Sequence, residues 1–197
     1  MAERAIFTNR NTLFIAMEKE ALISDIIRDI FEQKAHETYF GEEVTQLQHA
    51  VQTYELAKEK NADLELCIGA FLHDIGHMID EDTEELGAIH HEQGGAKWLA
   101  ENGFSDRIVA VASEHVNAKR YLCYKYTSYR TKLSEASKAT LILQGGIMKP
   151  SEAALFQEHP FFDDIISVRL WDEQAKDKNK EPLDTELIYN QIEQLFN

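Results

Sequence analysis

Apolar residues recur at every third or fourth position along most of this chain, and this spacing limits the fold more than any other feature. It is the spacing by which an amphipathic helix buries one face. The pattern runs through residues 13–33, 46–57, 64–79, 107–122, 134–143, 162–176 and 185–196. No segment alternates apolar and polar residues as a half-buried strand would, and each proline falls between helical segments. The sequence therefore predicts an all-α helical bundle, with Ser134 and Ser151 as candidate N-caps.

The charge balance and the cysteines restrict the function classes. The chain has 35 acidic and 20 basic residues, for a formal net charge of -15. A field of this sign repels a phosphate backbone, so we expect no nucleic-acid partner. No apolar run approaches the roughly 18 residues of a membrane span, and no secretory signal is recognisable, so we expect a cytoplasmic protein without a membrane partner. Cys67 and Cys123 are predicted to be reduced, unpaired thiols.

The stretch FLHDIGHMID, residues 71–80, places metal-capable side chains inside an otherwise apolar helical segment. If one helix continues through 64–79, His73 and His77 share a face and Asp74 lies at its edge. Further polar residues lie in or beside apolar helical faces in the same way: His49, His91, His115 and Asp172. Unpaired polar groups are costly there, and one shared metal site would satisfy them all. Imidazole with carboxylate suits iron, manganese or zinc, and the lack of cysteine ligands argues against structural zinc.

The order of these residues resembles the signature of the HD-domain metal-dependent family, in which an early histidine precedes an adjacent His-Asp pair and a late aspartate. The resemblance covers about residues 39–176 and implies a single HD domain over 1–197, with N-terminal helices and a C-terminal helix packed on that core. Two further histidines between the pair and the late aspartate are typical of dinuclear members. The resemblance then implies that one ion is held by His49, His73, Asp74 and Asp172, the other by His91 and His115, with Asp74 as the bridge.

The flanking residues resemble a narrower group, the HD-domain mixed-valent diiron oxygenases that cleave 1-hydroxyphosphonates and are related to myo-inositol oxygenase. The matching positions are Tyr39, Glu42, Gln46, His77, Lys119, Ser134, Gln144 and Arg169. The resemblance implies two iron ions as an Fe(II)/Fe(III) pair and O2 as co-substrate. It implies catalytic roles for Asp74, His77 and Tyr39, and substrate binding by Glu42, Gln46, His77, Lys119, Ser134, Gln144 and Arg169. By the same resemblance, Tyr39 occupies the oxygen-binding position until the substrate draws the loop with Glu42 away.

The charges near the predicted ligands suit a small organophosphonate substrate. Lys119 follows His115 by one helical turn and Arg169 precedes Asp172 by three residues, so both face the metal site and could neutralise a phosphonate dianion. Glu42 would meet a cationic end. The implied substrate is an (R)-1-hydroxy-2-(trimethylammonio or amino)ethylphosphonate, which would give phosphate with glycine betaine or glycine. A trimethylammonium group, slightly preferred, also favours aromatic faces, for which the candidates are Tyr39, Phe40, Tyr124, Tyr126, Phe161 and Phe162.

Two other functions fit the same ligand pattern. A dinuclear HD-domain phosphohydrolase of a small phosphate ester or nucleotide would use the same six ligands, because two ions can hold an attacking hydroxide and a leaving oxygen. A non-catalytic HD-domain interaction module would not need to keep all six. The residues that favour oxidation over hydrolysis are Tyr39, Glu42, Lys119 and Arg169, which lie outside the His-Asp stretch.

Overall fold

The computed structural model describes residues 22–34, 37–39, 41–79, 87–180 and 184–197, without the side chains of 87–90. In this part of the chain the helices are α2 (Ile23–Lys34), α3 (Gln46–Glu59), α4 (Leu64–Leu72), α5 (Gly76–Ile79), α6 (Gly87–Glu101), α7 (Asp106–Lys125), α8 (Thr127–Lys132), α9 (Glu135–Leu143), α10 (Pro150–Phe156), α11 (Phe162–Gln174) and α12 (Thr185–Gln194). The same residues contain no strand, only an isolated antiparallel bridge between Thr38 and Thr45. The predicted all-α class is confirmed.

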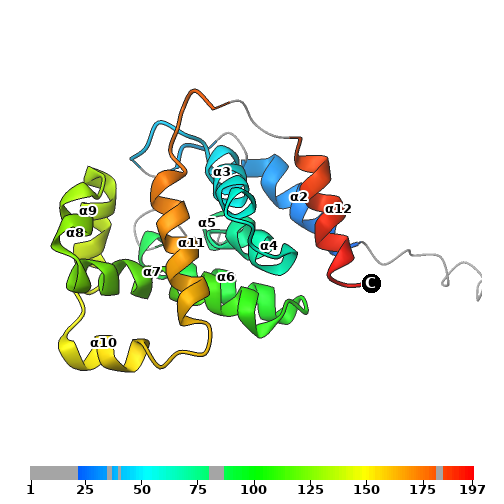
Figure 1. Ribbon diagram of the computed structural model, residues 1–197. Helices are drawn as coiled ribbons and strands as arrows, with labels where there is room; N and C mark the ends of the chain where they lie inside the picture. The colour runs from blue at the N-terminus through cyan, green and yellow to red at the C-terminus, as the bar shows by residue number, and fades with distance from the viewer. Residues whose placement is uncertain (1–21, 35–36, 40, 80–86, 181–183) are drawn as a thin grey trace, which may run out of the picture.

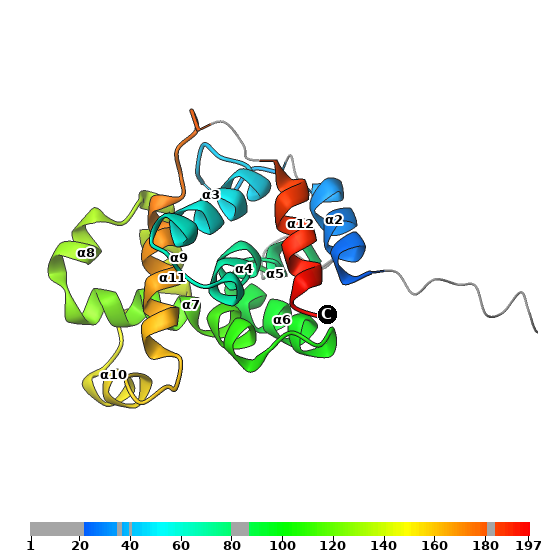
Figure 2. The same ribbon diagram turned by 45° about the vertical axis from the view of Figure 1, so that its right-hand side comes forward.

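Helix α4 forms the centre of the bundle because its sequence, LELCIGAFL, is apolar on almost every side. It packs against α3, α7, α11 and α12, and its residues 66–72 are all buried. Figures 1 and 2 show α2 and α12 side by side at one end of the molecule and α8, α9 and α10 at the other. Helix α11 runs between these ends and packs on α3 and α7. The polar residues of the central helices are therefore enclosed by helices from distant parts of the chain.

Side-chain caps set the beginnings of several helices. Thr45 and Gln48 form a reciprocal capping box at the start of α3, and Asp63 accepts a hydrogen bond from Leu66 N at the start of α4. The predicted cap Ser134 is confirmed, since its hydroxyl accepts from Ser137 N at 3.0 Å. The prediction for Ser151 is wrong: α10 begins earlier, with Lys149 at the N-cap position and a proline in the first helical position, which needs no N–H donor.

The prediction of one continuous helix over 64–79 is also wrong. Helix α4 ends at Leu72, and a tight turn with i→i+3 hydrogen bonds, such as Ile75 N to Leu72 O at 3.0 Å, leads into α5. The turn brings Gly76 against the backbone of α6, where a Cβ atom would overlap the His91 carbonyl. Because of this break, His73 and His77 lie on different elements and do not share a helical face.

The cysteines are buried and unpaired, as predicted. None of the described helices is long and apolar enough to cross a membrane.

Candidate functional site

Five helical regions bring the six predicted metal ligands together in the core. His49 lies in the first turn of α3, and His73 and Asp74 follow the end of α4. The others come from the first half of α6, the middle of α7 and the last turn of α11. All six are buried, with no more than 5% of any residue exposed: His49, His73, Asp74, His91, His115 and Asp172. Asp74 lies in the turn that follows the end of α4 at Leu72, and this turn places its carboxylate between the histidines.

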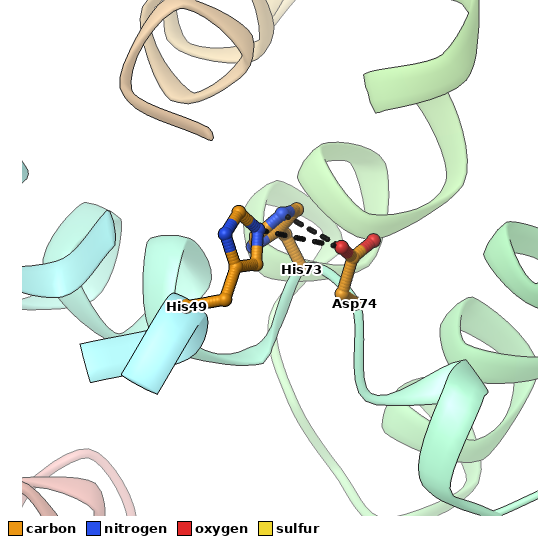
Figure 3. A group of neighbouring side chains, drawn as sticks. All are labelled: His49, His73 and Asp74. Carbon is orange, nitrogen blue, oxygen red and sulfur yellow. Dashed lines mark ion pairs between the residues drawn. The ribbon is translucent and has the colours of Figure 1, made fainter. Parts of the chain in front are cut away.

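The Asp74 carboxylate lies between two pairs of histidines. Its Oδ2 atom is 3.5 Å from His49 Nε2 and 3.3 Å from His73 Nε2, an arrangement seen in Figure 3. Its Oδ1 atom is 3.4 Å from His91 Nε2 and 3.1 Å from His115 Nε2. Each carboxylate oxygen therefore belongs to a separate group of donors, and Asp74 is shared by both groups.

Asp172 adds a second carboxylate to the group that contains His49. Its Oδ1 atom is 3.5 Å from His49 Nε2, and its Oδ2 atom is 3.7 Å from His73 Nε2 and accepts a hydrogen bond from Arg169. Burial opposes ionisation, but the Arg169 guanidinium holds the pKa of the Asp172 carboxyl below its usual range. Burial likewise opposes ionisation of Asp74, but the facing histidines, His73 first, keep its pKa well below the usual value.

Backbone carbonyls orient most of the histidine rings. The Nδ1 atoms of His49, His73 and His115 lie 2.9, 2.8 and 2.7 Å from the carbonyl oxygens of residues 175, 70 and 112. An Nδ1–H group that donates to a carbonyl leaves Nε2 as the lone-pair atom, which is the tautomer a metal ion needs. His91 differs, since its Nδ1 is 3.7 Å from a carboxylate oxygen of Glu92.

The unmet hydrogen-bonding capacity of these atoms fits two metal ions. His49 Nε2, His73 Nε2, Asp74 Oδ1 and Asp172 Oδ1 are buried and have no hydrogen-bond partner, a state that native proteins avoid. His91 Nε2 and His115 Nε2 are only 3.1 Å apart. A cation in each donor group would satisfy all of these atoms at once. With imidazole and carboxylate donors and no thiolate, the set suits iron, manganese or zinc.

A cavity of about 50 Å³ adjoins the second donor group. Its lining combines the donors with charged and hydroxyl side chains from α7, α9 and α11. The lining residues are Tyr39, Glu42, Asp74, His77, His91, His115, Val116, Lys119, Ala136, Ser137, Thr140, Gln144 and Arg169. Most residues that the sequence predicts for substrate binding are therefore brought to one cavity beside the candidate metal centre.

Lys119 is a buried cation in this cavity, with 5% of the residue exposed. Its ammonium group donates to Thr140 Oγ1 at 2.9 Å, and among the described residues no carboxylate lies within ion-pair distance of it. Burial, and then the nearby charge of Arg169, lowers the pKa of Lys119 to about 8. The site therefore contains a positive charge, unpaired among the described residues, with which an anionic ligand could form an ion pair.

Arg169, in contrast, already has carboxylate partners within the protein. It donates to Asp172, to Glu173 and, through Nε at 2.9 Å, to the hydroxyl of Tyr129. These carboxylates outweigh the effect of burial and raise the pKa of Arg169 above its usual value. Arg169 thus holds the Asp172 carboxylate in place while it lines the cavity.

The turn with Tyr39 and Glu42 closes the cavity from the other side. Tyr39 stacks on His49 with ring centroids 4.0 Å apart, and its hydroxyl donates to Asp74 Oδ2 at 3.0 Å. Burial, and then the Asp74 charge, raises the pKa of Tyr39 well above its usual value. Gly41 has φ +72°, and a Cβ atom there would lie 2.8 Å from Ala136 Cβ, so glycine lets the turn pack against α9.

His77 is placed beside the second donor group. Its ring stacks on His91 with centroids 3.7 Å apart and lies edge-on to Tyr39 at 6.5 Å. Burial, and then the neighbouring His91, lowers the pKa of His77 to about 3. A neutral imidazole at this position can both donate and accept a hydrogen bond.

Two residues predicted to bind substrate do not line the cavity. Gln46 is buried at the start of α3, and the Ser134 hydroxyl serves as the cap of α9. Ser137, one turn further along α9, lines the cavity together with Thr140. The i, i+3 spacing of these two hydroxyls on a predicted helix was the available signal. Phe40, a predicted aromatic contact, lies outside the described residues.

The chain is similar to known proteins over most of its length. The family model described as HD domain matches residues 46–144. A protein of Leisingera caerulea named 1-hydroxy-2-(trimethylamino)ethylphosphonate dioxygenase (glycine-betaine-forming) is 40% identical over 169 residues, which cover 82% of this chain and 84% of that protein. Hydroxymethylphosphonate dioxygenase of Gimesia maris is 36% identical over 174 residues, or 85% of this chain and 86% of that protein.

An uncharacterized protein of Acanthamoeba polyphaga mimivirus is 37% identical over 174 residues, covering 84% of this chain and 80% of that protein. The similarities cover much more of the chain than residues 46–144. The resemblance predicted from the sequence is confirmed: the chain belongs to the HD-domain family and is similar over most of its length to proteins named hydroxyphosphonate dioxygenases.

Proposed function

We propose that this protein is a diiron oxygenase that uses O2 to break the C–P bond of a small 1-hydroxyphosphonate. The observation that carries the proposal is the position of Lys119, a buried cation without a carboxylate partner among the described residues, in the cavity beside a two-ion donor set. Relatives named for reactions of this kind support it. Phosphate-ester hydrolysis uses similar donor sets, but the relatives with informative names are dioxygenases.

Six residues would hold the two ions. His49, His73 and Asp172 would bind one ion, His91 and His115 the other, and Asp74 both. An Fe(II)/Fe(III) pair would supply the redox chemistry by which O2 oxidises the carbon that bears the hydroxyl group. One substrate and one O2 then give one phosphate and one carboxylic acid, and each product gains one oxygen atom.

The cavity residues would bind and orient the substrate. Lys119 would pair with the phosphonate, and the hydroxyl groups of Ser137 and Thr140 would add neutral hydrogen bonds. Neutral His77 would hydrogen-bond the substrate on the side of the second donor group. Tyr39, hydrogen-bonded to Asp74, would fill the site until the substrate arrives, and so limit O2 consumption without substrate.

The substituent on the hydroxylated carbon decides the second product. With a trimethylammonio or amino group on the adjacent carbon, the acid would be glycine betaine or glycine; with hydrogen alone, it would be formic acid. The sequence favours a cationic substituent because it places Glu42 beside the predicted ligands.

The test is the stoichiometry of the iron-loaded protein with a panel of 1-hydroxyphosphonates. We expect about two iron ions per chain and one phosphate released per O2 consumed with at least one member of the panel. Phosphate release without matching O2 consumption contradicts the proposal and favours hydrolysis.

A further inference from the structure

We propose that Lys176 is a specificity-determining residue, which neutralises Glu42 and selects 1-hydroxyphosphonates that carry no cationic substituent. This inference rests on the function proposed above. It differs from the expectation that the sequence alone gives for Glu42.

Glu42 already has a cationic partner within the protein. Its Oε1 atom lies 3.1 Å from Lys176 Nζ, and each side chain is only 13% exposed. The contact is an ion pair without hydrogen-bond geometry. Lys176 Nζ also donates at 3.3 Å to Ser137 Oγ and to Glu173 Oε1, and Ser137 is a lining residue of the cavity. Lys176 is not itself a lining residue of the cavity, but its ammonium group neutralises the carboxylate that a cationic end of the substrate would have to reach.

The backbone holds Lys176 in this position. Ala175 O accepts from His49 Nδ1 at 2.9 Å, and Asp177 exchanges two hydrogen bonds with the Gln52 side chain, at 2.9 and 3.0 Å. Lys176 lies between these two anchors on α3. Little conformational entropy is therefore lost when the ion pair forms, and moving Lys176 away would disturb the anchored backbone of residues 175–177.

The charges at this end of the cavity are balanced. Glu42 and Glu173 carry the negative charges, and Lys176 and Arg169 are paired with them. A partly buried carboxylate that already has a cation partner gains little from a second one, and the second cation would also meet the repulsion of Lys176. The balance disfavours both the ammonium and the trimethylammonium substituent.

Among the described residues, the cavity offers little of the aromatic surface that a quaternary ammonium favours. Tyr39 is the aromatic residue among the described lining residues, apart from histidines, and one face of its ring is stacked on His49. Tyr124 and Tyr126 are 41% and 50% exposed and do not line the cavity. Of the other candidates, Phe161 and Phe162 pack against the hydrophobic core.

The volume of the cavity points the same way. About 50 Å³ corresponds to roughly four water positions, at about 10–15 Å³ for each water centre. Departure of Tyr39 would enlarge this space for any substrate, and hydroxymethylphosphonate would need the least enlargement, whereas the trimethylammonio analogue adds a methylene carbon, a nitrogen and its methyl groups. The substrate class that fits is hydroxymethylphosphonate or a 1-hydroxyphosphonate with a similarly small, uncharged substituent.

The experiment compares kcat/KM of the iron-loaded protein for hydroxymethylphosphonate and for the trimethylammonio and amino hydroxyethylphosphonates. We expect the wild-type protein to prefer hydroxymethylphosphonate by at least about tenfold. Lys176→Met should change the ratio by about 10- to 100-fold in favour of the cationic substrates, because it frees a partly buried carboxylate for a charged hydrogen bond. Lys176→Arg, which keeps the charge, should retain the preference.

A matched control is available two residues further along. Lys178 pairs with Glu43 at 2.6 Å, but the side chains are 52% and 75% exposed, so Lys178→Met should leave the ratio unchanged. In the Lys176→Met background, Glu42→Gln should abolish the gain with cationic substrates.

The outcomes separate this inference from the proposed function. A wild-type protein that prefers a cationic substrate overturns the role of Lys176 and leaves the oxygenase function standing, and this result does not depend on the folding of any variant. An unchanged ratio in folded Lys176→Met also overturns it. If the iron-loaded wild-type protein consumes O2 with none of the substrates, the proposed function itself fails.

Discussion

Replacement of Lys119 by methionine should stabilise the protein while it removes activity. Lys119 is 5% exposed, and burial lowers its pKa from the usual 10.5 to about 8. Since one pKa unit corresponds to about 1.4 kcal/mol, the charged lysine costs the folded protein about 3 kcal/mol at pH 7. The substitution also removes the hydrogen bond to Thr140, and this loss offsets about 1 kcal/mol of the gain in stability. The free energy of unfolding of Lys119→Met should therefore exceed that of the wild type by about 2 kcal/mol.

The stability difference between Lys119→Met and the wild type should depend on pH. Because the pKa of Lys119 is lowered on folding, the unfolded chain binds more protons between about pH 8 and 10.5. The penalty is present in full below about pH 8 and is gone above 10.5. The advantage of Lys119→Met should thus be largest at pH 7 and nearly absent at pH 10.

The assay is urea unfolding of the metal-free proteins at both pH values, together with kcat/KM of the iron-loaded proteins at pH 7. Activity should fall by about 100-fold or more, because a charged hydrogen bond to the phosphonate is lost. Lys97→Met serves as the control, since Lys97 forms an exposed pair with Glu101 and should change stability by less than about 0.5 kcal/mol. A variant that is less stable than wild type at pH 7, or that keeps its activity, would refute the assignment of Lys119 as an anion-binding group.

Four further predictions follow from the site. For the wild type, kcat/KM should fall as the pH rises through about 8, where Lys119 loses its proton; Lys119→Arg should lack this fall, and a profile unchanged by the substitution would contradict the reasoning. Asp74→Asn should lower the iron content of both positions, since the carboxylate faces both donor groups, whereas loss of a single ion would show that Asp74 does not bridge. Tyr39→Phe should consume O2 without substrate, as followed with an oxygen electrode; uptake that stays strictly substrate-dependent would rule out this role. Gly76→Ala should destabilise the protein by about 3 kcal/mol or more, because its Cβ would overlap the His91 carbonyl, and a normal thermal midpoint would contradict the close packing of α5 and α6.

The clustering of the candidate metal ligands was predictable because its sequence signal is local. A histidine or aspartate inside an apolar helical segment indicates a buried polar group whatever the tertiary structure, so His49, His73, Asp74, His115 and Asp172 could be found from spacing and hydrophobicity. The family resemblance then supplied the division into two ions, with which the two faces of Asp74 are consistent.

The features that the sequence did not predict have a common physical cause, since they depend on contacts between distant segments. The end of α4 at Leu72 is imposed by the approach of Gly76 to α6, which the apolar pattern of 64–79 does not reveal. Ser134 and Ser137 are both hydroxyl residues of one segment, and only the cap geometry separates the structural one from the cavity-lining one. Lys176 lies just beyond the end of α11, and its proposed role depends on the hydrogen bonds that hold the following residue, Asp177, to α3.

Oxidative cleavage is tested most directly by phosphate release from a 1-hydroxyphosphonate by one iron-loaded preparation, with and without O2. The substrate should be hydroxymethylphosphonate, with the cationic analogues in parallel. Our account predicts phosphate only in the presence of O2, in step with O2 consumption and with formation of the matching carboxylic acid. Phosphate release of equal rate under anaerobic conditions, or anaerobic hydrolysis of a phosphate ester by the same preparation, would contradict it.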